Sequence, residues 1–328
     1  MARRLSLLLM ILLAQSAWAG ASQSPPLYHQ VVGGPEDYLV PGKTNLGLLA
    51  AEKGVKFTVV ARRNHLKDPY RLKPGMVLRI NTAHIVPAEL ADGLVINLPE
   101  LLMYHFEKGG YQRCYSLALG KPTWQTPTGT YRIEEKRTNP TWHVPPSIQE
   151  EMEDEGLEVM EKVPPGPKNP LGHYYMETSA SGIGIHATNN PYSIGRYVSH
   201  GCIRMLPQEM VQLFPQIEVG TPVKIIYRPI KLAVTPEGRV FLEAHPDIYD
   251  LMEDAPLDYL RDLAEHYQLG DRIDWDKVPA ILKAKEGIAR EITKGSPQPL
   301  PLQPSPAKGN SPQEVQLSPL QPPKPKVE

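Results

Sequence analysis

The chain has 328 residues, and its 35 lysines and arginines nearly balance its 36 aspartates and glutamates, so the formal net charge is −1. A chain without excess positive charge lacks the attraction that draws proteins to nucleic acids or to anionic membrane surfaces, so both partner classes are excluded on electrostatic grounds. The length allows two domains and further segments.

Residues 1–19 have the composition of a secretory signal peptide. Arg3 and Arg4 form a basic start, residues 5–13 form an apolar run, and residues 17–19 (A-W-A) form a small-x-small cleavage site. The apolar run is shorter than the roughly 20 residues of a membrane-spanning helix. The alternative is an uncleaved anchor; no cysteine follows the cleavage site, which excludes a lipoprotein anchor. We expect an exported mature protein without a transmembrane segment.

Residues 36–83 are expected to form a small α/β unit with the order strand, helix, helix, strand. Its opening strand lies near Tyr38, and the later elements are expected at 46–53, 59–66 and 72–80. The residues that follow, 83–92, are expected to be a linker.

Residues 92–228 are expected to form a mainly β domain. The predicted strands span 93–98, 101–106, 111–119, 128–135 and 221–227. Short strands separated by turn-forming residues favour a β-sandwich or a barrel-like sheet over a parallel α/β sheet. Within this domain, residues 136–172 lack the alternating pattern of a strand and contain several prolines and an acidic run at 150–161. We interpret them as a lid-like insertion that lines a substrate groove, with a merely solvated acidic face as the alternative.

The chemistry is concentrated in Gly182–Met205 (G-I-G-I-H-A-T-N-N-P-Y-S-I-G-R-Y-V-S-H-G-C-I-R-M). Cys202 is a candidate nucleophile, because a nearby imidazole can generate its thiolate. The alternation before His186 predicts a strand that ends at this histidine, and the turn-rich loop after it can return the chain so that imidazole and thiol lie side by side. A helix with Pro207 in its first turn is expected after the cysteine.

Two alternatives remain open for these residues. A cysteine near histidines is often structural or metal-binding, although the C-x-x-C and H-x-x-x-H spacings typical of zinc sites do not accompany them. The second cysteine, Cys114, lies in an alternating strand pattern and is interpreted as a free, half-buried thiol. Redox control through a Cys114–Cys202 disulfide is the alternative.

The C-terminal part divides into two segments. Residues 229–294 predict a β-hairpin at 229–250 and helices at 257–267 and 278–292, which form a short helical extension without assigned chemistry. Residues 295–328 are expected to be a disordered, proline-rich tail, because ten of the last 33 residues are proline and no apolar period survives.

The sequence of the central segment resembles that of a known protein family. S-H-G-C-I-R, preceded by I-G-I-H-A-T, is similar to the signature of the L,D-transpeptidase catalytic domain, the YkuD family. The resemblance continues at T-P-T-G-T-Y (126–131), V-P-P-G-P-K-N-P-L-G (163–172) and G-T-P-V-K-I-I (220–226). It implies a β-sandwich or barrel-like catalytic domain over residues 92–228 that acts on peptidoglycan stem peptides. Residues 36–83 resemble a LysM module, which implies glycan binding.

The resemblance also implies roles for individual residues. Cys202 is the implied nucleophile and His186 the implied general base, oriented by the backbone carbonyl of Ala187. His200 and Gly201 are implied to shape the oxyanion site, and Arg204 to anchor a substrate carboxylate. Ser199 and Asn189 are expected to be polar contacts.

The expected reaction is acyl transfer to an amine after release of D-alanine from a tetrapeptide stem. The acceptor is either diaminopimelate of another stem, giving a 3→3 cross-link, or a lysine of an outer-membrane lipoprotein; water instead would give a carboxypeptidase. A non-catalytic wall-binding protein is the competing class, and a papain-like protease is disfavoured by the order of the residues. No metal or organic cofactor is expected, and the periplasm is the expected location.

Overall fold

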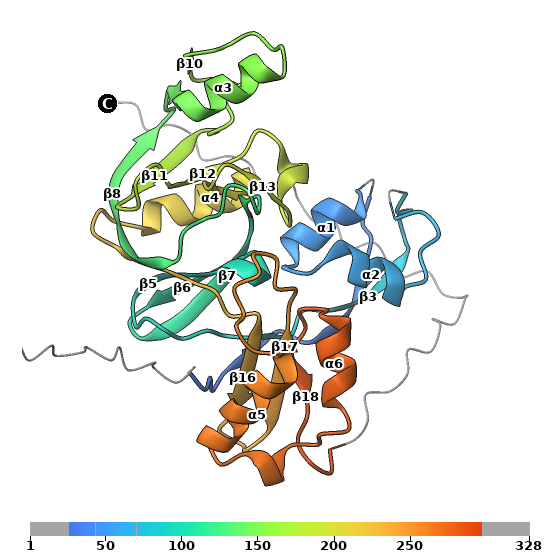
Figure 1. Cartoon of the computed structure of the whole chain (residues 1–328). Coiled ribbons are helices and arrows are strands. Elements are labelled where there is room, and N and C mark those ends of the chain that lie inside the picture. The colour runs from blue at the N-terminus through green and yellow to red at the C-terminus, as the bar shows by residue number, and fades with distance from the viewer. Residues whose placement is uncertain (1–25, 43, 70, 297–328) are drawn as a thin grey trace, which may run out of the picture. The chain divides into compact units, whose positions relative to one another are not determined.

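The computed structural model describes residues 26–42, 44–69 and 71–296 (Figure 1). The predicted signal peptide and the proline-rich tail from residue 297 lie outside the described residues. Among the helices of the described ranges, none has the length and apolarity that crossing a membrane requires.

The N-terminal unit has the predicted order of strand, helix, helix and strand. Its elements are β2 (Pro35–Leu39), α1 (Leu46–Glu52), α2 (Phe57–Arg63) and β3 (Val77–Asn81), with β2 and β3 antiparallel. Asn45 caps α1, because its Oδ1 accepts a 2.9 Å hydrogen bond from the Leu48 amide. The two helices and the β2–β3 strand pair enclose a small apolar core that includes Leu46, Leu49 and Leu78.

The segment after β3 is not the linker that the sequence predicts. Residues 84–85 form β4 (His84–Ile85), which pairs antiparallel with β1 (Val31–Val32). Ile85 packs with Ala233 and Phe241 from the C-terminal part of the chain, and His84 is buried. The linker prediction failed here because two residues are too few to show a strand period.

The central sheet confirms the mainly β prediction. It contains β5 (Gly93–Asn97), β6 (Leu102–Glu107), β7 (Gly110–Gly120), β8 (Gly129–Thr138), β11 (Tyr174–Thr178), β12 (Gly184–Ala187), β13 (Tyr197–Ser199), β14 (Ile203–Met205) and β15 (Pro222–Ile226). The strand order is β13-β7-β14-β12-β11-β8-β15-β5-β6, and β6 also pairs with β7. Eight strands therefore close on themselves, and β13 is attached at the end of β7.

The long strand β7 closes the barrel-like sheet because its two halves pair with different neighbours. Residues up to Ser116 pair with β6, whereas Leu117 and Ala118 pair with β14. Alternate residues such as Leu117 and Leu119 point into the apolar core. Helix α4 (Pro207–Leu213) adds Met210 and Leu213 to that core and begins at the predicted proline.

The insertion lies between β8 and β11 (Figure 1). It contains β9 (Trp142–His143), α3 (Pro146–Asp154) and β10 (Lys162–Val163), and β9 pairs antiparallel with β10. It begins later than predicted, because β8 continues to Thr138, which pairs with Tyr174. Asn169 is fully buried at its base, where Nδ2 donates to the Pro140 carbonyl at 2.8 Å.

The C-terminal part packs helices against a small sheet of β16 (Ile230–Val234), β17 (Val240–Ala244) and β18 (Arg290–Glu291). The helices are α5 (Pro256–His266) and α6 (Val278–Ala284). The predicted helix over 278–292 is wrong beyond Ala284, because Lys285 adopts a left-handed conformation that ends α6. The described residues also include short 3₁₀ helices at Leu98–Glu100, Pro191–Ser193, Phe214–Gln216 and Gly270–Arg272.

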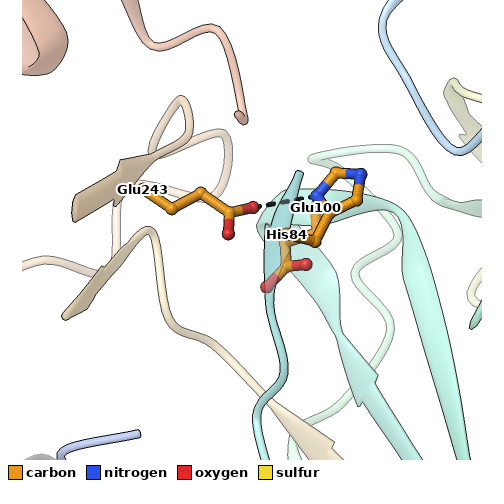
Figure 2. Close-up of side chains that lie close together, drawn as sticks. All are labelled: His84, Glu100 and Glu243. Atoms are coloured by element: carbon orange, nitrogen blue, oxygen red, sulfur yellow. Dashed lines mark hydrogen bonds and ion pairs between the residues drawn. The ribbon is translucent and has the colours of Figure 1, made fainter. Parts of the chain in front are cut away.

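A buried ion cluster joins these parts of the chain. Lys231 Nζ lies 2.6 Å from Glu100 Oε1 and 3.2 Å from Glu243 Oε2, and all three side chains are fully buried. The carboxylate of Glu243 also contacts His84 Nδ1 at 3.1 Å (Figure 2). The same carboxylate lies 2.8 Å from His245 Nε2. Because β4 contributes His84, the 3₁₀ helix between β5 and β6 contributes Glu100 and the C-terminal sheet contributes Lys231 and Glu243, the cluster stabilises the association of these parts.

Replacing Lys231 with Met is expected to destabilise the fold strongly, because Glu100 and Glu243 then lose their buried counter-ion. The expected loss in the free energy of unfolding is roughly 3–5 kcal/mol. Urea denaturation followed by circular dichroism measures it. Lys53→Met is the matched control, because Lys53 forms an ion pair with Glu36 at the surface and should cost at most about 1 kcal/mol. Equal losses for the two variants would contradict a structural role for the cluster.

Candidate active site

Two neighbouring parallel strands bring His186 and Cys202 together. In the pairing of β12 with β14, Ile185 lies opposite Ile203 and His186 opposite Arg204. Cys202 directly precedes β14. Because side chains alternate along a strand, Cys202 and Arg204 project to the same face as His186, while Ile185 and Ile203 enter the core. The loop therefore returns the chain so that the strand after the cysteine pairs with the strand of the histidine; direct contact between thiol and imidazole stays a prediction.

His186 is held in one orientation by the backbone. Its imidazole is buried, and Nδ1 lies 2.6 Å from the Ala187 carbonyl oxygen, as the sequence predicted. Nδ1–H therefore donates to this carbonyl, which leaves the Nε2 lone pair free to accept a proton.

The environment keeps the His186 imidazole neutral at pH 7. Burial lowers its pKa to about 4, and the charge of Arg204 acts in the same direction, while hydrogen bonds to the Ala187 and Leu171 backbone oppose the shift. A neutral imidazole at neutral pH is the protonation state that a general base requires.

Cys202 is a protonated thiol in this environment. Burial raises its pKa above the ordinary value of 9.0, and the Gly184 backbone and Arg204 only partly offset that effect. Sγ lies 3.5 Å from the Gly182 carbonyl oxygen, to which the thiol donates. The resting pair is therefore a neutral thiol beside a neutral imidazole, so nucleophilic attack requires transfer of the thiol proton to His186.

The turn that carries Cys202 is fixed by Gly201 and two hydroxyl groups. Gly201 has a φ of +105°, and a Cβ at this position would lie 2.9 Å from Ile183 Cδ1, so glycine is required. Thr126 Oγ1 donates to the Gly201 carbonyl at 2.8 Å, and Ser199 Oγ donates to the Cys202 carbonyl at 2.5 Å. Ser199 is 1% exposed, so its hydroxyl supports the nucleophile's backbone here; contact with substrate stays a prediction.

His200 faces the insertion. Its Nε2 contacts Glu151 Oε2 of α3, and its ring meets Trp124 edge-on with the ring centroids 5.3 Å apart. The other carboxylate oxygen of Glu151 accepts from Lys121 Nζ at 2.7 Å. The predicted role of His200 in the oxyanion site stays a prediction. Sequence reasoning missed Glu151, Trp124 and Lys121, and the acidic run at 150–161 was a signal for Glu151 alone.

Three further residues surround the catalytic pair. Arg204 Nε is buried and has no hydrogen-bond partner among the described residues, and burial lowers the pKa of this guanidinium. Tyr175 of β11 lies opposite His186, with the ring centroids 6.3 Å apart, and no sequence signal singled it out. Asn189 is exposed, and its Nδ2 donates to the Lys168 carbonyl at 3.2 Å.

A cavity of about 290 Å³ lies where β12 ends. The second half of the insertion and the start of α4 enclose it, and its wall includes Pro167, His173, Thr188, Asn189 and Val211. The insertion therefore lines a hollow next to Ala187, the residue whose carbonyl orients the general base.

One group of side chains has donor atoms close enough to hold a metal ion, and it lies outside this site. The ligand atoms of His84, Glu100 and Glu243 lie within 4.8 Å of one another (Figure 2). The ammonium of Lys231 already contacts both carboxylates, however, and supplies the positive charge that they need. Within the described ranges, no such group includes Cys202, His186 or His200.

Comparison with known proteins places this geometry in a family. Residues 91–225 match the L,D-transpeptidase catalytic domain, YkuD. The chain is 32% identical over 252 residues to the probable L,D-transpeptidase YcfS of Escherichia coli, a match that covers 75% of this chain and 79% of the relative. It is also 32% identical to the probable L,D-transpeptidase YbiS of E. coli, covering 66% and 70%.

Solved structures give weaker matches. The catalytic domain of the Enterococcus faecium L,D-transpeptidase is 25% identical and covers 42% of this chain and 99% of that chain, with a TM-score of 0.33. The sequence relationships, which extend over most of the relatives' length, establish the assignment: the chain belongs to the YkuD family of L,D-transpeptidases.

Proposed function

We propose that this protein is a periplasmic L,D-transpeptidase that acts on peptidoglycan tetrapeptide stems through an acyl-enzyme on Cys202. One observation carries the proposal: the neutral His186 imidazole and the Cys202 thiol lie on one face of adjacent strands, with Nδ1–H of His186 committed to the Ala187 carbonyl. Family membership supports a peptidoglycan substrate, and the signal-like segment 1–19 supports export.

The first half of the reaction forms a thioester. Nε2 of His186 takes the thiol proton as the Cys202 sulfur attacks the carbonyl carbon at the L-centre of diaminopimelate. The tetrahedral intermediate then collapses, the bond to the D-alanine nitrogen breaks, and the imidazolium returns its proton to that leaving amine. Backbone N–H groups near Cys202 and Gly201 are the proposed stabilisers of the oxyanion.

The second half transfers the acyl group to an amine. His186 takes a proton from the acceptor as its nitrogen attacks the thioester, and the carbon–sulfur bond breaks. The proton then returns to the Cys202 sulfur. We propose diaminopimelate of a second stem or a lipoprotein lysine as the acceptor. Water as the acceptor would make the protein an L,D-carboxypeptidase.

Residues 36–83 are proposed to act as a LysM-like module that keeps the enzyme on its polymer. The support is their strand-helix-helix-strand order and a cavity of about 280 Å³ lined in part by Asn45, Lys56 and Tyr192. A non-catalytic wall-binding protein is the competing function, and it is disfavoured by the oriented His186–Cys202 pair.

The reaction is tested by incubating the protein with disaccharide tetrapeptides and analysing products by mass spectrometry. Wild type is expected to release D-alanine and to form 3→3 dimers, and Cys202→Ala is expected to do neither, because the thioester cannot form. Cys114→Ala is the matched control and should retain activity. Tripeptide without dimers would indicate water or a lipoprotein lysine as the acceptor, and no release of D-alanine by wild type would contradict the proposed function.

Reactivity of the thiol should depend on pH in a way set by the two pKa shifts. In a Cys114→Ala background, alkylation of Cys202 by iodoacetamide should accelerate from about pH 6 to about pH 9 without a plateau, because the pKa of the thiol is raised. Protonation of His186 should abolish base assistance only near pH 4. A plateau at neutral pH would instead indicate a preformed thiolate–imidazolium pair.

Replacing Arg204 with Met should impair substrate use. A charge-assisted hydrogen bond to a substrate carboxylate is worth about 1.5–3 kcal/mol, so kcat/KM should fall by roughly 10-fold to 150-fold. Release of D-alanine under steady-state conditions measures this change. Arg196→Met is the control, because Arg196 is an exposed arginine in the segment between β12 and β14. Unchanged kinetics for Arg204→Met would rule out the carboxylate contact.

A further inference from the structure

The insertion between β8 and β11 reaches the site at two separate places. Its C-terminal end reaches His186, because the backbone of Leu171 lies close enough to this imidazole to oppose the lowering of its pKa. Its helix contacts the segment that carries the nucleophile, through Glu151 and His200. The insertion therefore spans the site from one catalytic residue to the other.

Glu151 makes the second contact by bridging two side chains, those of Lys121 and His200. Its Oε1 lies 2.7 Å from Lys121 Nζ, and its Oε2 contacts His200 Nε2. These partners belong to one local structure, because the Lys121 amide donates to the Ser199 carbonyl at 2.9 Å. A single carboxylate thus fastens α3 to the turn S-H-G-C that presents Cys202.

Helix α3 has little else to hold it in place. None of its residues is buried, so it lacks the apolar face that normally fixes a helix on a protein. Glu150, Glu153 and Asp154 of the same helix are exposed. The position of the helix therefore depends on polar contacts, and Glu151 supplies two of them.

We propose that Glu151 is a positioning residue that fixes α3 as a wall of the substrate groove. Its carboxylate does so through its contacts with His200 and Lys121. The inference rests on the proposed function for the identity of the substrate. It assigns His200 a structural role, because its Nε2 is committed to Glu151 and its ring packs against Trp124. Loss of the contact should weaken the binding of a long stem peptide and leave the thiol chemistry intact.

The experiment compares Glu151→Gln with Glu150→Gln in the full chain. Both remove one carboxylate from α3, but only the first removes the bridge. Glu151→Gln should raise KM for disaccharide tetrapeptide about threefold to tenfold, as expected for the loss of one partly exposed ion pair with Lys121 and one contact with His200, with kcat within about twofold of wild type. Glu150→Gln should match wild type in both parameters.

Two further measurements keep the proposal separate from the proposed function. Amide hydrogen exchange over residues 146–154 should be faster in Glu151→Gln than in Glu150→Gln, whether or not the protein turns over stem peptides. The rate of Cys202 alkylation by iodoacetamide should be equal in the two variants, because this small reagent reaches the thiol without binding against α3. Absence of D-alanine release by wild type would refute the proposed function and leave the exchange result to decide on the contact.

Two results would overturn the proposal. Identical exchange in the two variants would mean that Glu151 does not hold the helix. A fall in kcat with unchanged KM would mean that the Glu151–His200 pair acts in the chemical step.

Discussion

The parallel pairing of β12 with β14 is the constraint on which the site depends. A shift of one residue in this register would turn Cys202 and Arg204 into the core and bring Ile203 to the outer face. The apolar core fixes this register on one face of the sheet. On the other face Gly184 allows the Tyr175 ring of β11 to pack on β12, because a Cβ there would lie 2.4 Å from that ring. Catalytic geometry is thus secured by the same alternation that packs the barrel-like sheet.

The buried ion cluster has a different part in the architecture. Charges without water are costly unless they are paired, so Lys231 and Glu243 of the C-terminal sheet need Glu100 nearby. An apolar contact would tolerate sliding, whereas a shift that separated these side chains would leave a buried charge unpaired. The chain segment 229–294 therefore contributes to the placement of the catalytic domain although it carries none of its proposed chemistry.

The individual strands around the catalytic pair could be predicted from the sequence, because period-two alternation and turn residues are local signals. Their order in the sheet could not, because it is set by pairings between segments that are distant in the chain. The strand ending after His186, the helix starting at Pro207 and the Ala187 contact were predicted and confirmed. The partners of His200 were not, because Glu151 lies 49 residues away and resembles its exposed acidic neighbours. The buried pairing of Lys231 was equally hidden, because lysine in a strand normally signals a solvent-facing position.

The neutral state of the resting thiol has a consequence for the lifetime of the enzyme. Thiolates, not thiols, react readily with peroxides and disulfides, and oxidation beyond sulfenic acid is essentially irreversible. Because burial raises the pKa of Cys202, the sulfur carries little negative charge at neutral pH. The raised pKa therefore slows oxidation of this thiol, and burial raises the pKa of Cys114 and slows its oxidation in the same way.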